Sequence, residues 1–156
     1  GRDKGQIARL IGGLRERASS IAAKLGRLPA LLVAKPGLDG HSNGAEQIAF
    51  RARDCGFAVA YDGIRLTPAE IAAAAKTKNP PVIGLSILSG SHKELVAEVM
   101  RELKAAGLSK TPVIVGGIVP PEDEADLKAL GVTRIYTPKD FDLNAIMGDM
   151  LDIVAK

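Results

Sequence analysis

A chain of 156 residues has the length of one domain, and its 46% hydrophobic and 25% charged content is that of an ordinary globular protein. Its net charge of +3 comes without a basic run interleaved with aromatic residues, and its single cysteine excludes an internal disulfide. No apolar run approaches a membrane span and no signal peptide is visible, so the composition predicts a cytoplasmic protein that binds neither nucleic acid nor membrane.

The first segment with helical spacing covers residues 7–25, where an apolar stripe recurs among polar positions. Gly12 and Gly13 weaken this helix by roughly 1 kcal/mol each relative to alanine. Two interpretations stay open: a solvated helix packed on the domain, or a linker helix that leads to a further domain. The regular pattern begins only near Pro29, which favours an N-terminal linker helix over residues 1–28 and a domain over residues 29–156.

From Pro29 onward, short apolar runs alternate with amphipathic helical segments. Thr67 and Glu70 have the spacing of a capping box, and Gly107 and Gly131 end two of the helices. The predicted strands cover residues 31–34, 58–61, 82–86, 112–115 and 134–136, and the predicted helices cover 45–54, 68–76, 92–106, 122–130 and 143–154. This alternation predicts an α/β fold, a flavodoxin-like (Rossmann-like), doubly wound, five-stranded parallel sheet with strand order 2-1-3-4-5.

The ligand crevice of such a sheet lies at the carboxyl ends of the strands, near the switch between the first and third strands. Small or polar residues gather at these strand ends in the sequence. They are Asp39, His41, Ser86, Gly116, Gly117 and Thr137. We therefore expect these residues to form a single site.

The stretch D-G-H-S-N-G follows the first predicted strand. A histidine two residues after a carboxylate is suited to metal ligation, because a ligating imidazole usually donates its other ring N–H to such a group. The alternatives are that His41 is a surface-loop histidine bonded to Asp39, and that Asp39 forms a turn before Gly40. Glycines at positions 37, 40 and 44 favour a bulky neighbour lying over the loop.

The pattern D-x-H-x-x-G resembles the signature of cobalamin-binding domains that hold the cofactor base-off and His-on. In that family the histidine replaces the cofactor's own dimethylbenzimidazole as the lower cobalt ligand. Two further landmarks follow in the expected order, the pattern S-x-L-x-G at residues 86–90 and a glycine pair at residues 116–117. The strings K-P-G-L-D-G-H-S-N-G, G-L-S-I-L-S-G-S-H and Y-T-P-K-D resemble the C-terminal domain of the ethylmalonyl-CoA and methylmalonyl-CoA mutase family over about residues 29–155.

This resemblance implies roles for the residues of the loop. His41 is the expected cobalt ligand, and Asp39 is expected to orient it through the far ring nitrogen. Ser42 and Asn43 either contact amides of the corrin ring or cap the following helix.

The resemblance also implies a slot for the displaced nucleotide tail between the sheet and the helix after the loop. Such a slot needs small residues, and the family implies a hydrogen bond from the Ser86 hydroxyl to the freed benzimidazole nitrogen. Alternatively, Ser86 bonds to the backbone at a strand end and Leu88 packs in the core. The expected cofactor-binding residues are Asp39, Gly40, His41, Ser42, Asn43, Gly44, Ser86, Leu88, Gly90, Gly116, Gly117 and Thr137, with His41 as the metal ligand.

The resemblance predicts the cobalamin-binding domain of an adenosylcobalamin-dependent acyl-CoA mutase. Its partner would be a substrate-binding barrel, in the same enzyme or in a partner subunit, so we expect this chain alone to bind cofactor without turnover and to hold no catalytic residue. The alternatives are a stand-alone cobalamin carrier or sensor, a corrinoid methyltransferase subunit, and a receiver-like module that binds no cobalamin.

Overall fold

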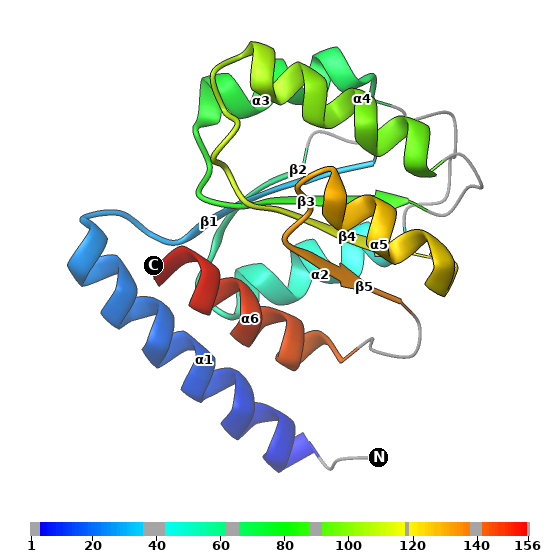
Figure 1. The fold of residues 1–156 in the computed structure, drawn as a ribbon. Coiled ribbons are helices and arrows are strands. Elements are labelled where there is room, and N and C mark those ends of the chain that lie inside the picture. The colour runs from blue at the N-terminus through cyan, green and yellow to red at the C-terminus, as the bar shows by residue number, and fades with distance from the viewer. Residues whose placement is uncertain are drawn as a thin grey trace.

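The computed structural model describes residues 4–35, 43–61, 66–87, 92–117, 119–137 and 142–155, apart from the side chains of residues 43, 44 and 92. Helices and strands alternate along the whole of this chain (Figure 1). In order they are α1 (Lys4–Leu25), β1 (Ala30–Ala34), α2 (Asn43–Asp54), β2 (Ala58–Tyr61), α3 (Pro68–Lys78), β3 (Ile83–Ile87), α4 (His92–Ala105), β4 (Val113–Gly117), α5 (Pro121–Ala129), β5 (Arg134–Tyr136) and α6 (Leu143–Ala155). Each predicted element is present, with its ends displaced by three residues at most.

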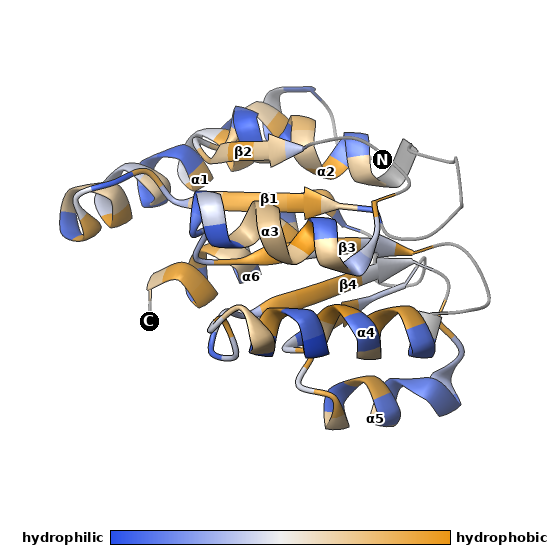
Figure 2. Ribbon diagram, turned by 90° about the horizontal axis from the view of Figure 1, so that it is seen from above, coloured by the Kyte–Doolittle hydropathy of each residue, from blue (hydrophilic) through white to orange (hydrophobic). Residues whose placement is uncertain are grey.

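The five strands form one parallel sheet in the order β2-β1-β3-β4-β5, so the predicted topology is confirmed. Figure 2 shows β1 and most of β3 and β4 in the colours of hydrophobic residues, as expected for strands buried on both faces, with paler carboxyl ends on β3 and β4. We call the side on which the strands finish the carboxyl edge and the side on which they begin the amino edge. Because every connection crosses over, α2 to α6 run back from the carboxyl edge to the amino edge.

One face of the sheet is covered by α2 and α6, with α1 packed outside them (Figure 1). Leu31 and Val33 of β1 and Ile114 of β4 point to this face. The part of α2 that meets them consists of alanines, namely Ala45, Ala49 and Ala52. Cys55 is buried in the same cluster, where it packs as a small apolar group, and burial raises the pKa of its thiol.

The other face is covered by α3, α4 and α5 and is filled by branched aliphatic side chains. Ile83, Leu85 and Ile87 of β3 and Val113 and Val115 of β4 all point into it. Their regular alternation with the residues of the first face follows from the two-residue period of a strand.

Helix ends follow the sequence signals. The Thr67 hydroxyl accepts a hydrogen bond from the Glu70 N–H at 3.1 Å, and the Thr67 N–H donates to Glu70 Oε1 at 2.9 Å, so the predicted capping box is present. These bonds hold the pKa of the Glu70 carboxyl below its ordinary value. Gly107 and Gly131 have φ of 81° and 107° just after α4 and α5, the left-handed conformation that glycine adopts most readily.

Helix α1 packs against α6 through its second half. Leu14, Ala18 and Ile21 are its buried residues, and Arg17 pairs with Asp152 of α6 at 2.5 Å. This packing agrees with the interpretation of a helix lying on the domain, and the linker role stays a prediction. Within the described ranges no helix is long and apolar enough to span a membrane.

Candidate functional site

The carboxyl edge brings together the predicted site residues that the structure describes. Ser86 lies near the end of β3, Gly116 and Gly117 finish β4, and Thr137 directly follows β5. In the sheet register Ser86 is paired with Gly116, and Gly116 is paired with Tyr136. Three neighbouring strands therefore place residues 86, 116 and 136 in one row across the sheet.

The members of this row point to the face covered by α2 and α6. Tyr136 belongs to the apolar cluster of that face, and Gly116 is two residues after Ile114, which belongs to it as well. Ser86 alternates with Leu85 and Ile87, which point the other way. The row thus faces α2, the helix that begins after residues 36–42, and the resemblance predicts the tail slot between the sheet and this helix.

Gly116 and Gly117 differ in whether the surrounding structure has room for a side chain. Among the described residues, a Cβ on Gly116 would meet nothing nearer than the Tyr136 carbonyl oxygen at 3.9 Å, so this part of the fold leaves space there. A Cβ on Gly117 would overlap the carbonyl oxygen of Ile87 and lie 2.8 Å from its carbonyl carbon. The φ of Gly117 is 149°, which side chains rarely allow. The sheet itself therefore requires Gly117, whereas nothing described in the chain requires glycine at 116.

Tyr136 forms the far end of the row. Its side chain is buried, and its hydroxyl donates a hydrogen bond to Asp149 Oδ2 of α6 at 2.7 Å. Burial and this carboxylate raise the pKa of the Tyr136 hydroxyl, so the ring stays neutral at physiological pH. The bond fixes the ring between β5 and α6, where it can serve as one wall of a slot.

The loop that carries the proposed metal ligand lies outside the described residues. This applies to Asp39, Gly40, His41, Ser42, Leu88 and Gly90, and to the side chains of Asn43 and Gly44. The backbone of Asn43 and Gly44 begins α2. Among the described residues no group of three histidine, cysteine or carboxylate side chains could hold a metal ion.

Two residues of this edge were not singled out from the sequence. Lys35 directly follows β1 and is fully buried, which is rare for lysine. Its carbonyl oxygen accepts a hydrogen bond from the Leu66 N–H at 3.2 Å. A lysine placed between an apolar strand and a proline was the available signal for it. Tyr136 had no such signal, because its place in the row depends on the pairing of β4 with β5.

This row fits an elongated ligand segment that is partly apolar and carries a hydrogen-bonding nitrogen. Gly116 and the alanines of α2 leave space, Ser86 supplies a hydroxyl that can donate or accept, and Tyr136 supplies an aromatic wall. The nucleotide tail of a base-off cobalamin has this character, so the described residues fit the cofactor that the resemblance implies.

Comparison with known proteins agrees with this fit. The B12 binding domain family matches residues 29–140. The ethylmalonyl-CoA mutase of Cereibacter sphaeroides is 60% identical over 90% of this chain, and that of Methylorubrum extorquens is 58% identical over 88%. The methylmalonyl-CoA mutase of Escherichia coli is 39% identical over 84% of the chain.

The chain spans only 22%, 20% and 18% of the length of these three relatives. Among solved structures, a cobalamin-binding protein from Desulfitobacterium hafniense superposes with a TM-score of 0.69 at 22% identity, covering 92% of this chain and 70% of its own. The monomethylamine corrinoid protein of Methanosarcina barkeri superposes with a TM-score of 0.64 at 14% identity, covering 92% and 63%. At these identities the two structures support the fold alone.

Proposed function

The chain belongs to the B12-binding domain family, and from this premise we propose that it holds adenosylcobalamin base-off, with His41 as the lower cobalt ligand. We further propose that it is the cobalamin-binding part of an acyl-CoA mutase of the ethylmalonyl-CoA or methylmalonyl-CoA type. Its similarity to both kinds of mutase supports this assignment.

The observation that carries the proposal is the row of Ser86, Gly116 and Tyr136 at the carboxyl edge. It adjoins the start of α2, the helix that follows the D-x-H-x-x-G stretch. The space at Gly116 has no explanation within the described chain, and a ligand tail would explain it.

Each residue then has a defined task. His41 offers an unprotonated ring nitrogen to cobalt, and Asp39 accepts a hydrogen bond from the other ring nitrogen, which fixes its orientation. Ser86 bonds to the nitrogen of the displaced base, and Tyr136, held by Asp149, closes the slot. When bound, the cofactor supplies a radical by homolysis of its cobalt–carbon bond.

The proposed enzyme needs a second domain for the acyl-CoA substrate. The mutase relatives are several times longer than this chain, and the chain corresponds to one part of them. We propose that this part binds cofactor and leaves substrate recognition to a barrel domain reached through α1. The chain alone is then expected to bind cobalamin without rearranging any acyl-CoA.

The histidine ligand is tested by electron paramagnetic resonance of the cobalt(II) form. The chain holds two histidines, His41 and His92, so His92→Gln is a matched control for His41→Gln. With ¹⁵N-labelled histidine, we expect the nitrogen splitting to change from a triplet to a doublet in the parent and in His92→Gln. The signal should lose the histidine splitting in His41→Gln. A nitrogen splitting that is the same with ordinary and with ¹⁵N-labelled histidine would disprove ligation by histidine. Cobalamin binding itself is measured independently by the visible spectrum.

A further inference from the structure

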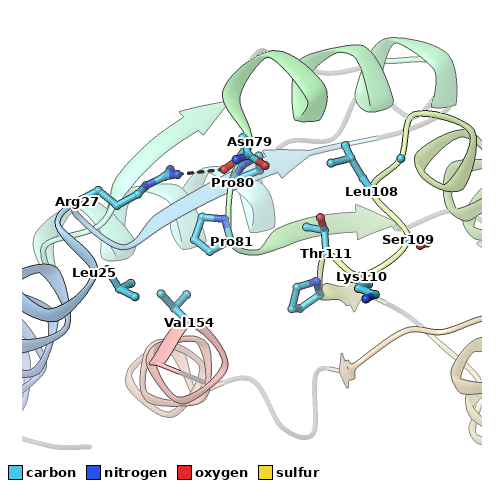
Figure 3. Close-up of a pocket in the computed structure, with 12 residues that line it drawn as sticks. Leu25, Arg27, Asn79, Pro80, Pro81, Leu108, Ser109, Lys110, Thr111 and Val154 are labelled. Atoms are coloured by element: carbon cyan, nitrogen blue, oxygen red, sulfur yellow. Dashed lines mark hydrogen bonds between the residues drawn. The ribbon is translucent and has the colours of Figure 1, made fainter.

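The amino edge of the sheet, opposite the proposed cofactor site, contains a hollow of about 620 Å³. It lies where α1, α3, α4 and α6 end, and Figure 3 shows the side chains around it. Leu25, Pro81, Leu108 and Val154 form its apolar part. The Arg27 guanidinium at its side donates a hydrogen bond to the Asn79 carbonyl oxygen at 3.3 Å.

A second hollow of about 390 Å³ lies between the ends of α4 and α5. Both hollows are lined by Leu108, Ser109 and Thr111, so the two adjoin. We call the combined surface the amino-edge groove. It runs from the end of α1 to the end of α5.

Exposed leucines gather at this groove. Leu25 and Leu130 line it with 46% and 38% of their surface exposed, and Leu28, which follows Arg27, is 54% exposed. Leu28 itself lines neither hollow but follows Arg27, which lines the first. The other large hydrophobic residues that are exposed in the described chain are Leu10, which lines a separate hollow beside the start of α6, and Phe50 on α2. Exposed apolar surface beside a hollow is typical of an interaction site.

The charge of the groove is positive. Arg27, Arg101, Lys104 and Lys110 are among its described lining residues, which include no aspartate or glutamate. Helix C-termini carry roughly half a negative charge each, so the five helices that end at this groove, α1, α3, α4, α5 and α6, offset about two and a half of these four charges. The last turns of these helices add the lysines Lys24, Lys76, Lys78 and Lys128 and the carboxylates Glu102, Asp126 and Asp152, none of which lines either hollow, so the balance depends on the four lining residues. The basic side chains therefore exceed what the helix dipoles neutralise.

We propose that the amino-edge groove binds an acidic, amphipathic segment of a partner polypeptide. Leucine-like side chains of that segment cover Leu25, Leu28 and Leu130, and its carboxylates face the arginines and lysines of the rim. The groove lies at the opposite edge from Ser86 and Gly116, so this interaction does not depend on the cofactor proposal.

The test uses a fluorescein-labelled helical peptide with leucines at i and i+4 and glutamates between them. One control peptide carries lysine for each glutamate, and a second carries serine for each leucine. We expect the acidic leucine peptide to bind the full chain more tightly than either control in fluorescence anisotropy, with an affinity that falls as salt rises.

Matched variants locate the binding. Leu28→Ser and Lys110→Glu should each lower the affinity for the acidic leucine peptide by about tenfold. A loss of this size is typical of removing an apolar anchor or reversing an interface charge. Leu10→Ser and Lys4→Glu make the same changes at exposed positions outside the groove and should leave affinity unchanged. Cobalamin binding is measured in all four variants and should persist, which shows that each still folds.

Three results would overturn the proposal. The first is equal binding of the three peptides, or an equal effect of groove and control variants. The second is full displacement by tripolyphosphate at matched charge with no effect of Leu28→Ser, which would make the groove an anion site only. The third is a concentration-dependent dimer in sedimentation that Leu28→Ser and Lys110→Glu dissolve while no peptide binds, which would assign the groove to a second copy of the chain.

Discussion

The two faces of the sheet are built on different plans. Towards α3, α4 and α5, the chain fills the space with isoleucine, leucine and valine from β3 and β4. Towards α2 and α6, the same two strands offer Ile114 together with the small residues Gly84, Ser86 and Gly116, and α2 offers alanines. One face is completed by large aliphatic side chains, whereas the carboxyl end of the other carries small residues and, among the described residues, leaves room for a Cβ at Gly116. The difference indicates where the fold supplies stability and where it reserves room for a ligand.

The neighbouring glycines of β4 give the largest expected contrast. Gly117→Ala should reduce the free energy of unfolding by about 3 kcal/mol or more, because the new Cβ overlaps the Ile87 backbone. Gly116→Ala should leave it unchanged or raise it by up to about 1 kcal/mol, since its site is open and alanine restricts the unfolded chain. Urea unfolding of the parent and of both variants measures these two changes in the free energy of unfolding. Similar losses at the two positions would mean that the row at residue 116 is filled by the chain itself.

The open space at Gly116 can be closed without touching the other face. Gly116→Leu should lower the affinity for cobalamin by about tenfold or more, because extra methylene groups in an occupied site cost about 1–3 kcal/mol. The control is a titration with an otherwise identical corrinoid that lacks the nucleotide tail. This corrinoid should bind the Gly116→Leu variant and the parent protein with equal affinity. If both corrinoids lose affinity equally, the row does not receive the tail.

Tyr136 lies on the face covered by α2 and α6, and its hydroxyl is bonded by the chain's own Asp149. Tyr136→Phe should lower stability by about 1–2 kcal/mol, because it removes the hydrogen bond to the Asp149 carboxylate. The folded chain raises the pKa of this hydroxyl above the ordinary value of about 10, so the parent's advantage is complete below about pH 10 and shrinks as pH rises further. Thermal unfolding of parent and variant between neutral and alkaline pH measures this difference. A constant gap across that range would contradict the assigned bond.

Ser86 gives the smallest expected effect. Ser86→Ala should lower the affinity for intact cobalamin by about two- to tenfold, which corresponds to the loss of a single hydrogen bond. The affinity for the tail-less corrinoid should not change. Ser86→Thr keeps the hydroxyl and should recover part of the loss. An unchanged affinity in Ser86→Ala would leave the hydroxyl with the backbone-bonding role that is also possible at a strand end.

Local signals in the sequence were sufficient for the elements and their order. Alternating apolar runs placed all five strands, and the Thr67 and Glu70 pair and the glycines after α4 and α5 marked helix ends that the structure confirms. The convergence of Ser86, Gly116 and Thr137 on one edge followed from topology alone.

What the sequence could not supply depends on strand register. The two adjacent glycines look alike in the chain, but only the pairing of Ile87 with Gly117 shows that one of them is required by the sheet. The same limit applies to Tyr136, which joins the row through its pairing with Gly116. Lys35 could have been noticed as a charge at a strand end, but its complete burial is a tertiary property.

The direction of α1 has a practical consequence for reporters. This helix has 22 residues and extends about 33 Å, whereas α6 beside it has 13 residues and extends about 20 Å. Leu25 and Val154 lie at the same hollow, so the extra length of α1 projects towards the carboxyl edge (Figure 1). A fluorescent protein fused before Lys4 would therefore sit on the side of the proposed corrin, and one fused after Ala155 would sit on the far side. Energy transfer to the coloured cofactor should quench the first fusion more strongly, which gives a binding assay with its own spatial control.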